Sequence, residues 1–143
     1  MHTSVEYAVP ASVASDYLAD PRHRPEWQSS LRRVTLLDDG GVRVGQRWRD
    51  HTAVGMTPLM ETTELQPGAV WSETGRWRGV QADLTLRFQD LPSGTGSRVD
   101  AELEIRGTGP WRPVAWAATR AGLPAVRADL KRAGRILAGR VAG

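Results

Sequence analysis

Acidic residues alternate with tryptophan in two stretches that have the period of β-strands. Trp48 and Asp50 occupy alternate positions of one stretch, and Trp71 and Glu73 those of another. Because alternate side chains of a strand point to the same face, an inward Trp71 brings Glu73 inward with it. Burial without a cation would raise the pKa of Glu73, and such a carboxyl can move a proton at an enolisable carbon near neutral pH. Glu73 and Asp50 are the candidate catalytic residues. The alternatives are that Glu73 is exposed or has its hydrogen bonds satisfied within the protein, and that Asp50 is solvated near the end of its strand.

The same alternation selects side chains that could line a cavity. The chain has six Trp against one Phe, and because a buried Trp needs a partner for its N–H, several together indicate an amphipathic cavity. The residues expected to contact a ligand, for which core packing is the alternative, are Trp48, Met60, Thr62, Trp71, Leu84, Leu86, Trp116 and Thr119.

Other chemistries lack their signatures. The chain has no cysteine, which excludes disulfides, thiolate nucleophiles and cysteine-ligated metals. Its three histidines form neither a metal-binding spacing nor the arrangement of a Ser-His-Asp triad. Gly94-x-Gly96 joins two predicted strands, so it indicates a hairpin and no nucleotide site. We expect no metal and no cofactor.

The length suggests a single domain over residues 1–143. No run of eighteen apolar residues and no secretion leader is present, so we expect no membrane span and a cytoplasmic location. The net charge of +3 is modest and the basic residues are scattered, which argues against nucleic-acid binding.

Hydrophobic periodicity predicts a strand, two short helices over Ser12–Ala19 and Arg22–Ser30, and then six more strands. The turn Asp38-Asp39-Gly40-Gly41 predicts a hairpin between the second and third strands. The strands are expected at Thr3–Val9, Leu31–Leu37, Val42–His51, Leu59–Leu65, Val70–Trp77, Val80–Leu91 and Arg98–Arg106.

The register of the last hairpin can be predicted from pattern and charge. Placing Phe88 opposite Ala101 keeps both apolar rows on one face. The same register sets two favourable charge pairs across the strands, Arg87 with Glu102 and Asp83 with Arg106.

The last third, Gly109–Val141, predicts one long helix with a kink at Pro124. Apolar residues at helical spacing form a stripe of Leu123, Val126, Leu130, Ala133 and Leu137, which extends back to Trp116. The opposite face is basic and carries Arg127, Lys131, Arg132, Arg135 and Arg140. Together these elements predict an α+β domain whose curved antiparallel sheet of about seven strands wraps the terminal helix.

Four segments resemble motifs of one family: Asp20-Pro21-x-x-x-Pro25-x-Trp27, Val44-Gly45-Gln46-Arg47-Trp48, Glu64-Leu65-Gln66-Pro67 and Gly94-Thr95-Gly96-Ser97-Arg98-Val99. With the order of elements, they make the chain similar to bacterial START-like (SRPBCC) proteins of the polyketide cyclase/dehydrase and lipid-transport group. The resemblance implies the helix-grip fold and a hydrophobic cavity between sheet and long helix. Some members cyclise polyketides of secondary metabolism, and many others only bind or carry metabolites.

Three functions follow as hypotheses. The first is binding of a small hydrophobic or aromatic, polyketide- or lipid-like metabolite by a monomer or homodimer. The second is a cofactor-free polyketide cyclase/aromatase or dehydratase, in which the cavity holds the chain in a reactive fold and Glu73 or Asp50 moves protons. The third is a protein-interaction domain that uses the basic helix face.

Overall fold

The computed structural model describes residues 1–142. The strands are β1 (His2–Tyr7), β2 (Leu31–Leu36), β3 (Arg47–Thr52), β4 (Leu59–Gln66), β5 (Val70–Trp77), β6 (Val80–Asp90) and β7 (Ser97–Gly107). The α-helices are α1 (Ala11–Ala19), α2 (Arg24–Trp27) and α3 (Arg112–Ala142). Single 3₁₀ turns, η1 (Pro21–His23) and η2 (Gly109–Trp111), precede α2 and α3.

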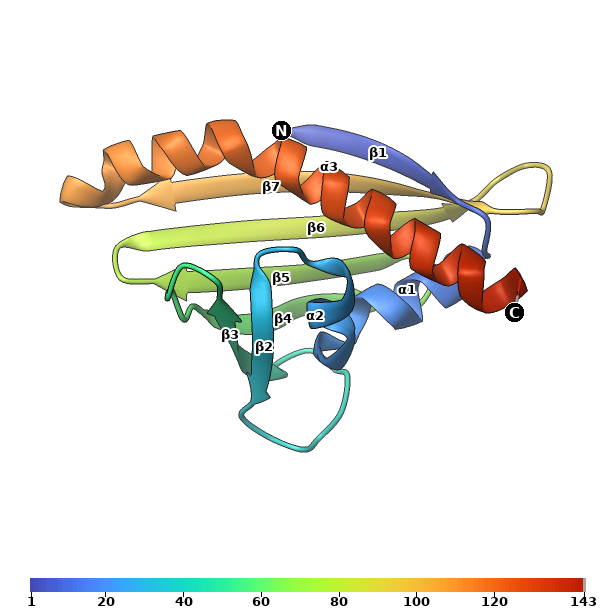
Figure 1. Ribbon diagram of the computed structural model, residues 1–143, viewed down its shortest axis with the longest axis horizontal. Coiled ribbons are helices and arrows are strands. Elements are labelled where there is room, and N and C mark those ends of the chain that lie inside the picture. Colours follow the sequence, from blue (N-terminus) through green and yellow to red (C-terminus); the bar gives the residue numbers. More distant parts are fainter. Residues whose placement is uncertain (143) are drawn as a thin grey trace.

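The strands form one antiparallel sheet in the order β1-β7-β6-β5-β4-β3-β2. The sheet is strongly curled, so that β2 and β3 run crosswise to β6 and β7 in the view of Figure 1. The long helix α3 packs against β7 and β1, and α1 and α2 connect the first strand to the far edge of the sheet (Figure 1). This is the α+β helix-grip fold predicted from the sequence, with seven strands around a long C-terminal helix.

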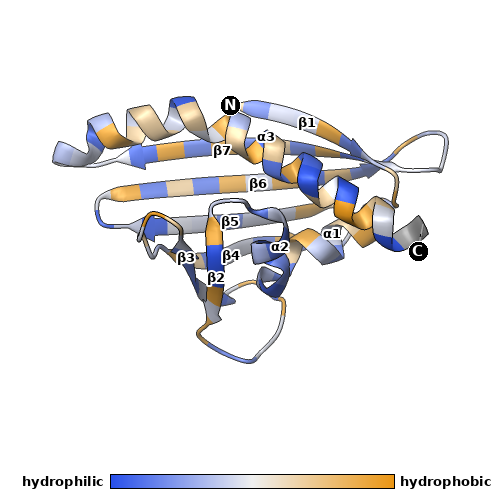
Figure 2. Cartoon of the chain, viewed as in Figure 1, coloured by the Kyte–Doolittle hydropathy of each residue, from blue (hydrophilic) through white to orange (hydrophobic). Residues whose placement is uncertain are grey.

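The core lies where the apolar rows of the sheet meet the stripe of α3. Figure 2 shows apolar and polar residues alternating along β6 and β7, as a sheet with one buried face requires. On α3, Leu130, Ala133 and Leu137 are buried, and Leu123 and Val126 pack at the margin of the core, as predicted.

The helix α3 is continuous through Pro124 and does not break there. Its axis changes direction part-way along (Figure 1), which agrees with the predicted kink because proline removes a backbone donor and displaces the preceding turn. The prediction that Trp116 points inward is wrong, since 63% of this residue is exposed. A stripe extrapolated from Leu130 across the bend does not describe the N-terminal half of the helix.

The predicted hairpin between β2 and β3 forms, but its connecting loop is longer than the predicted turn. Residues 37–46 form a long loop, and β3 begins only at Arg47. Gly45 has a φ of 88° and donates its N–H to the Thr62 carbonyl at 2.8 Å, while the Thr62 N–H donates to Gln46 at 3.0 Å. The end of this loop therefore bonds to β4, on the side of the chain away from β2.

The β6–β7 register differs from the predicted one by two residues. Phe88 lies opposite Val99, and Asp83 lies opposite Glu104. Arg106 still reaches Asp83 diagonally, at 2.7 Å. A slip of two residues keeps every side chain on its own face, so alternation alone cannot distinguish the two registers.

Two shorter segments also differ from their predicted bounds. β1 ends at Tyr7, before Pro10, and the second short helix consists of η1 and the single turn of α2. Pro21 starts η1, and Asp20 caps it by accepting the Arg22 N–H at 3.0 Å. The chain from Asp20 to Trp27 thus consists of two short helical turns that follow each other directly.

Candidate functional site

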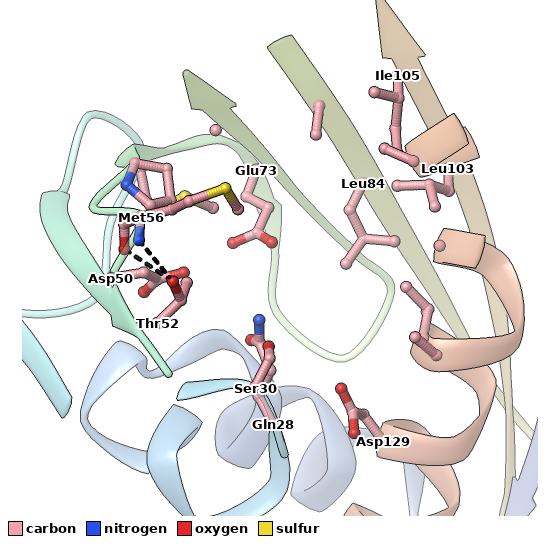
Figure 3. Close-up of a pocket in the computed structure, with 18 of the residues that line it drawn as sticks. Gln28, Ser30, Asp50, Thr52, Met56, Glu73, Leu84, Leu103, Ile105 and Asp129 are labelled. Carbon is pink, nitrogen blue, oxygen red and sulfur yellow. Dashed lines mark hydrogen bonds between the residues drawn. The ribbon is translucent and has the colours of Figure 1, made fainter. Parts of the chain in front are cut away.

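A cavity of about 410 Å³ lies between the sheet and α3. Its size is within the range of small-molecule sites in proteins. Figure 3 shows polar groups gathered on one side, where Asp50, Thr52, Glu73, Gln28 and Ser30 lie, and apolar side chains on the other. The cavity is therefore amphipathic, as the tryptophan-rich composition indicated.

The apolar wall is built by the last strands of the sheet and by α3. Leu84 of β6 and Leu103 and Ile105 of β7 face the cavity together (Figure 3). The helix contributes small or apolar residues at spacings of four and three, namely Val114, Ala118, Gly122, Ala125, Val126 and Leu130. Small residues on α3 leave the space that larger ones would fill.

The polar side is organised by Arg24, which begins α2 and is only 2% exposed. Several contacts hold its segment in place: Arg22 bonds to Asp20, and the His23 ring stacks on Tyr17 at 4.7 Å between centroids. Glu26 ties the same turn to the helices on both sides, since it accepts bonds from Tyr17 at 2.8 Å and Arg140 at 2.9 Å.

The Arg24 guanidinium binds two carboxylates from two strands. Its Nη1 donates to Glu73 Oε2 at 2.8 Å, and its Nη2 donates to Asp50 Oδ2 at 3.0 Å. A longer contact of 3.4 Å joins Nη2 to Glu73 Oε1. All three side chains are buried, so water screens these pairs little.

Two indole rings lie next to this ion cluster. The Arg24 guanidinium carbon lies 5.5 Å from the ring centroid of Trp48 and 5.8 Å from that of Trp27, distances at which cation–π attraction operates. The Trp48 indole N–H donates to Asp50 Oδ1 at 3.0 Å. Trp48 thus orients Asp50 and covers Arg24.

The electrostatics of the cluster single out Glu73. Burial raises the pKa of Glu73 to about 7; Arg24 opposes this rise, and the charge of Asp50 adds to it. One guanidinium shared by two ionised carboxylates leaves a net negative charge in a poorly hydrated place, so a proton on Glu73 is favourable. The raised pKa predicted for Glu73 agrees with this result, but the premise that no cation lies beside it is wrong. Asp50 is likewise 2% exposed and not solvated.

Another carboxylate, Asp129 of α3, also lines the cavity. It is 8% exposed and accepts hydrogen bonds from the Ser29 N–H at 3.2 Å and from Ser29 Oγ at 2.9 Å. In Figure 3 its carboxylate points toward the space that Gln28 and Glu73 also face. Thr52, beside Asp50 in Figure 3, also lines the cavity, and its hydroxyl donates to the Met56 carbonyl and accepts the Met56 N–H, both at 2.9 Å.

The structure brings together part of the predicted site. Of those residues, Asp50, Glu73, Met60 and Leu84 line the cavity. Four others are buried but lie outside its lining, namely Trp48, Thr62, Trp71 and Leu86. Thr119 is half-buried and donates to the Ala115 carbonyl at 2.8 Å, and it does not line the cavity. The exposed Trp116 does not line the cavity either.

The reason that Trp71 and Leu86 miss the cavity is their position along the strands. They are cross-strand partners, as are Glu73 and Leu84 two residues away. α1 packs on β5 and β6, and Trp71 and Leu86 belong to the buried core cluster that includes its residues. Strand parity identified the correct face but not how far along it the cavity extends.

Sequence reasoning missed Arg24, Gln28, Ser30 and Asp129 as lining residues. A signal for Arg24 was present, because two inward carboxylates on neighbouring parts of a sheet need a cation. Arg24 lies inside the Asp20–Trp27 motif that also carries Trp27. Asp129 gave no comparable signal, since on α3 it is flanked by exposed residues as well as by Leu130.

The basic face of α3 is largely used within the chain. Arg127 donates to the Ser4 carbonyl at 2.7 Å, Arg132 to the Glu26 carbonyl at 3.0 Å, and Arg140 to the Glu26 carboxylate. Within residues 1–142 no three His, Asp or Glu side chains converge as a metal site would require. None of the helices in the described part of the chain combines the length and apolar character needed to span a bilayer.

A family model matches residues 1–141; its description is polyketide cyclase / dehydrase and lipid transport. The chain belongs to this family. The family identification made from the sequence motifs is thereby confirmed. Comparison with curated proteins finds no match.

Solved structures of similar shape agree with the family. The di-domain ARO/CYC StfQ of the steffimycin biosynthetic pathway has a TM-score of 0.79 at 14% identity, covering 100% of this chain and 51% of that one. The di-domain ARO/CYC BexL of the BE-7585A pathway gives 0.72 at 17% identity, with 94% and 45% covered. DR_A0006 from Deinococcus radiodurans gives 0.64 at 21% identity, with 94% and 92% covered. At these identities the likeness concerns the fold, and this chain spans about half of each di-domain protein.

Proposed function

We propose that this protein binds a small, mostly apolar organic molecule, polyketide-like or lipid-like, in the cavity between the sheet and α3. The observation that carries the proposal is the cavity of about 410 Å³, with an apolar wall on one side and a few buried polar groups on the other. That combination is typical of sites that bury an apolar body and orient it through polar contacts. Membership of a polyketide cyclase/dehydrase and lipid-transport family supports this ligand class.

Filling the cavity from α3 tests the proposal. Ala118 lines the cavity, whereas its neighbour Ala117 is exposed and lies outside it. The Ala118→Phe variant should bind N-phenyl-1-naphthylamine, a neutral fluorescent probe, at least about tenfold more weakly than the wild type, a loss of about 1.4 kcal/mol. Ala117→Phe adds the same ring outside the cavity and should bind the probe like the wild type.

Equal probe affinity in the wild type and both variants, with circular dichroism showing intact folds, would place binding outside this cavity and contradict the proposal. Native mass spectrometry of the purified protein provides a second measurement. A co-purified ligand that is present in the wild type and Ala117→Phe, and absent from Ala118→Phe, is the expected result.

A second candidate function, cofactor-free cyclisation or dehydration of a polyketide, is favoured by one observation. Glu73 is a cavity-lining carboxyl whose pKa is raised to about 7 by burial, so both its protonated and ionised forms are populated near neutral pH. The cavity would contribute by holding a flexible chain with an enolisable carbon near this group. Two of the structurally similar proteins, StfQ and BexL, are di-domain ARO/CYC proteins.

Binding and turnover must be measured together to separate the two candidates. For a catalyst, Glu73→Gln should keep the affinity for a synthetic oligoketide thioester within about threefold and lose product formation by at least about a hundredfold, the lower end of general acid–base contributions. The matched variant Glu102→Gln, at an exposed carboxylate outside the cavity, should keep both. A wild type that binds several oligoketides and converts none supports the carrier and rules against the cyclase. Recognition of a partner protein by the basic face of α3 has no such observation in its favour, because three of its arginines contact the chain itself.

A further inference from the structure

The charges that line the cavity are unequal in sign. Three carboxyl groups line it, from Asp50 of β3, Glu73 of β5 and Asp129 of α3, against the single guanidinium of Arg24 from α2. The strands β4, β6 and β7 also contribute lining residues, including Met60, and none of these residues has a titratable side chain. This acidic lining contrasts with the net positive charge of the whole chain.

The one cation of the cavity is already engaged. Both terminal nitrogens of Arg24 bind carboxylates, at 2.8 Å to Glu73 and 3.0 Å to Asp50. The remaining nitrogen, Nε, is fully covered by protein atoms and so cannot reach a ligand in the cavity. An anionic ligand would therefore meet no available positive charge among the lining residues, and would be repelled by the carboxylates.

Glu73, by contrast, has capacity left for a ligand. Only one of its oxygens receives a short hydrogen bond, while the other has a single long contact of 3.4 Å. Figure 3 shows its carboxyl group directed into the cavity, opposite the apolar wall that contains Leu84. A donor on the ligand can bind this oxygen without breaking the pair with Arg24.

We propose that the ligand presents a protonated amine to Glu73 and lays its apolar body against the wall formed by Leu84, Leu103 and Ile105. This inference rests on the proposed function, since it names the ligand class of the same cavity. The amine N–H donates to the Glu73 carboxylate, and its positive charge balances the excess negative charge of the Arg24–Asp50–Glu73 cluster. A neutral alcohol binds more weakly, because it can donate a hydrogen bond but brings no charge. A carboxylate binds worst.

This charge balance links binding to pH. The charged groups that line the cavity with Glu73 are Arg24 from α2, Asp50 from β3 and Asp129 from α3. Burial raises the pKa of Glu73 to about 7. An alkylamine keeps its proton to about pH 10, so its affinity should rise between about pH 5.5 and pH 8 as Glu73 ionises. The affinity of an alcohol should change little.

Three compounds that share one ring system test the proposal: 2-(2-naphthyl)ethylamine, 2-(2-naphthyl)ethanol and 2-naphthylacetate. Isothermal titration calorimetry on the intact wild-type protein at about pH 8 should give an affinity for the amine about tenfold above that for the alcohol, and the weakest for the carboxylate. At about pH 5.5 the preference for the amine should shrink to about threefold or less. Glu73→Gln, which keeps the shape and removes the charge, should abolish both the preference and its pH dependence. Glu102→Gln makes the same change at an exposed carboxylate outside the cavity and should retain both.

The outcomes separate this inference from the proposed function. If the alcohol binds saturably and the carboxylate binds as tightly as the amine, the cavity is a ligand site but the amine inference is wrong. If none of the three compounds binds, the proposed function itself is contradicted for ligands of this size. Should Glu73→Gln fail to fold, the wild-type pH series decides, since an amine affinity independent of pH overturns the inference. Loss of the amine preference in Asp129→Asn would place the cation at α3 and overturn the assignment to Glu73.

Discussion

The raised pKa of Glu73 predicts that the folded protein becomes less stable as the pH rises through neutrality. Glu73 has a pKa of about 7 in the folded protein, against its ordinary value of 4.5, which we take for the unfolded chain. Between these values the folded state binds more protons than the unfolded state. The free energy of unfolding must therefore fall with increasing pH across this window. Below about pH 4.5 the group is protonated in both states and the loss vanishes.

The magnitude follows from the two pKa values. At about 1.4 kcal/mol per pKa unit, the difference corresponds to about 3 kcal/mol of unfolding free energy lost between pH 4.5 and pH 8. Little discount for solvent screening applies, because the Glu73 side chain is only 7% exposed. Set against a typical total stability of about 5–15 kcal/mol, this is a large and measurable term.

Urea unfolding followed by tryptophan fluorescence at several pH values measures this loss. Glu73→Gln serves as the reference, because glutamine keeps the shape of the side chain and does not titrate. The carboxylates with lowered pKa values, including Asp38 at about 2, are present in both proteins, so their contributions cancel in the difference. The wild-type stability minus the Glu73→Gln stability should decrease by about 3 kcal/mol from pH 4.5 to pH 8.

A difference that stays constant over this range would refute the reasoning, because it would mean that Glu73 titrates near 4.5 in the folded protein. An increase of the difference with pH would show that Arg24 dominates over burial and lowers the pKa of Glu73. Either result would also remove the observation that favours Glu73 as a proton-transfer group near neutral pH.

Two further predictions concern the packing around the site. Leu130→Asp should unfold the protein, because Leu130 is fully buried and an unpaired carboxylate there costs several kcal/mol. Lys131→Asp, at an exposed neighbouring position, should change the melting temperature little. Similar melting temperatures for the two variants would contradict the packing of α3. Arg24→Met should lower the free energy of unfolding by about 3–5 kcal/mol at pH 8, because it leaves two buried carboxylates without their cation. Arg22→Met removes a guanidinium that is 70% exposed and should change the free energy of unfolding little. Equal losses for the two variants in chemical denaturation would argue against a buried ion cluster at Arg24.

The site shows where inference from sequence reached its limit. Alternation with tryptophan placed Glu73 and Asp50 on the inner face, and both line the cavity. The same alternation placed Trp71 and Leu86 there, but they are packed in the closed core. Strand parity is a local property that chooses a face, whereas the length of the open cavity along that face depends on where α1 packs.

Local periodicity by itself determined the architecture. Residue spacing gives the alternating rows of β6 and β7 and the α3 stripe through Leu130 and Leu137. It can do so because the strand and helix periods are properties of the backbone. Only the tertiary structure decided the charge of the site. Arg24 lies in a short turn without any periodicity, and it meets Asp50 and Glu73 because the curled sheet and α2 converge in space. Tertiary packing also left Trp116 exposed and set the β6–β7 register, because a slip of two residues leaves the alternation unchanged.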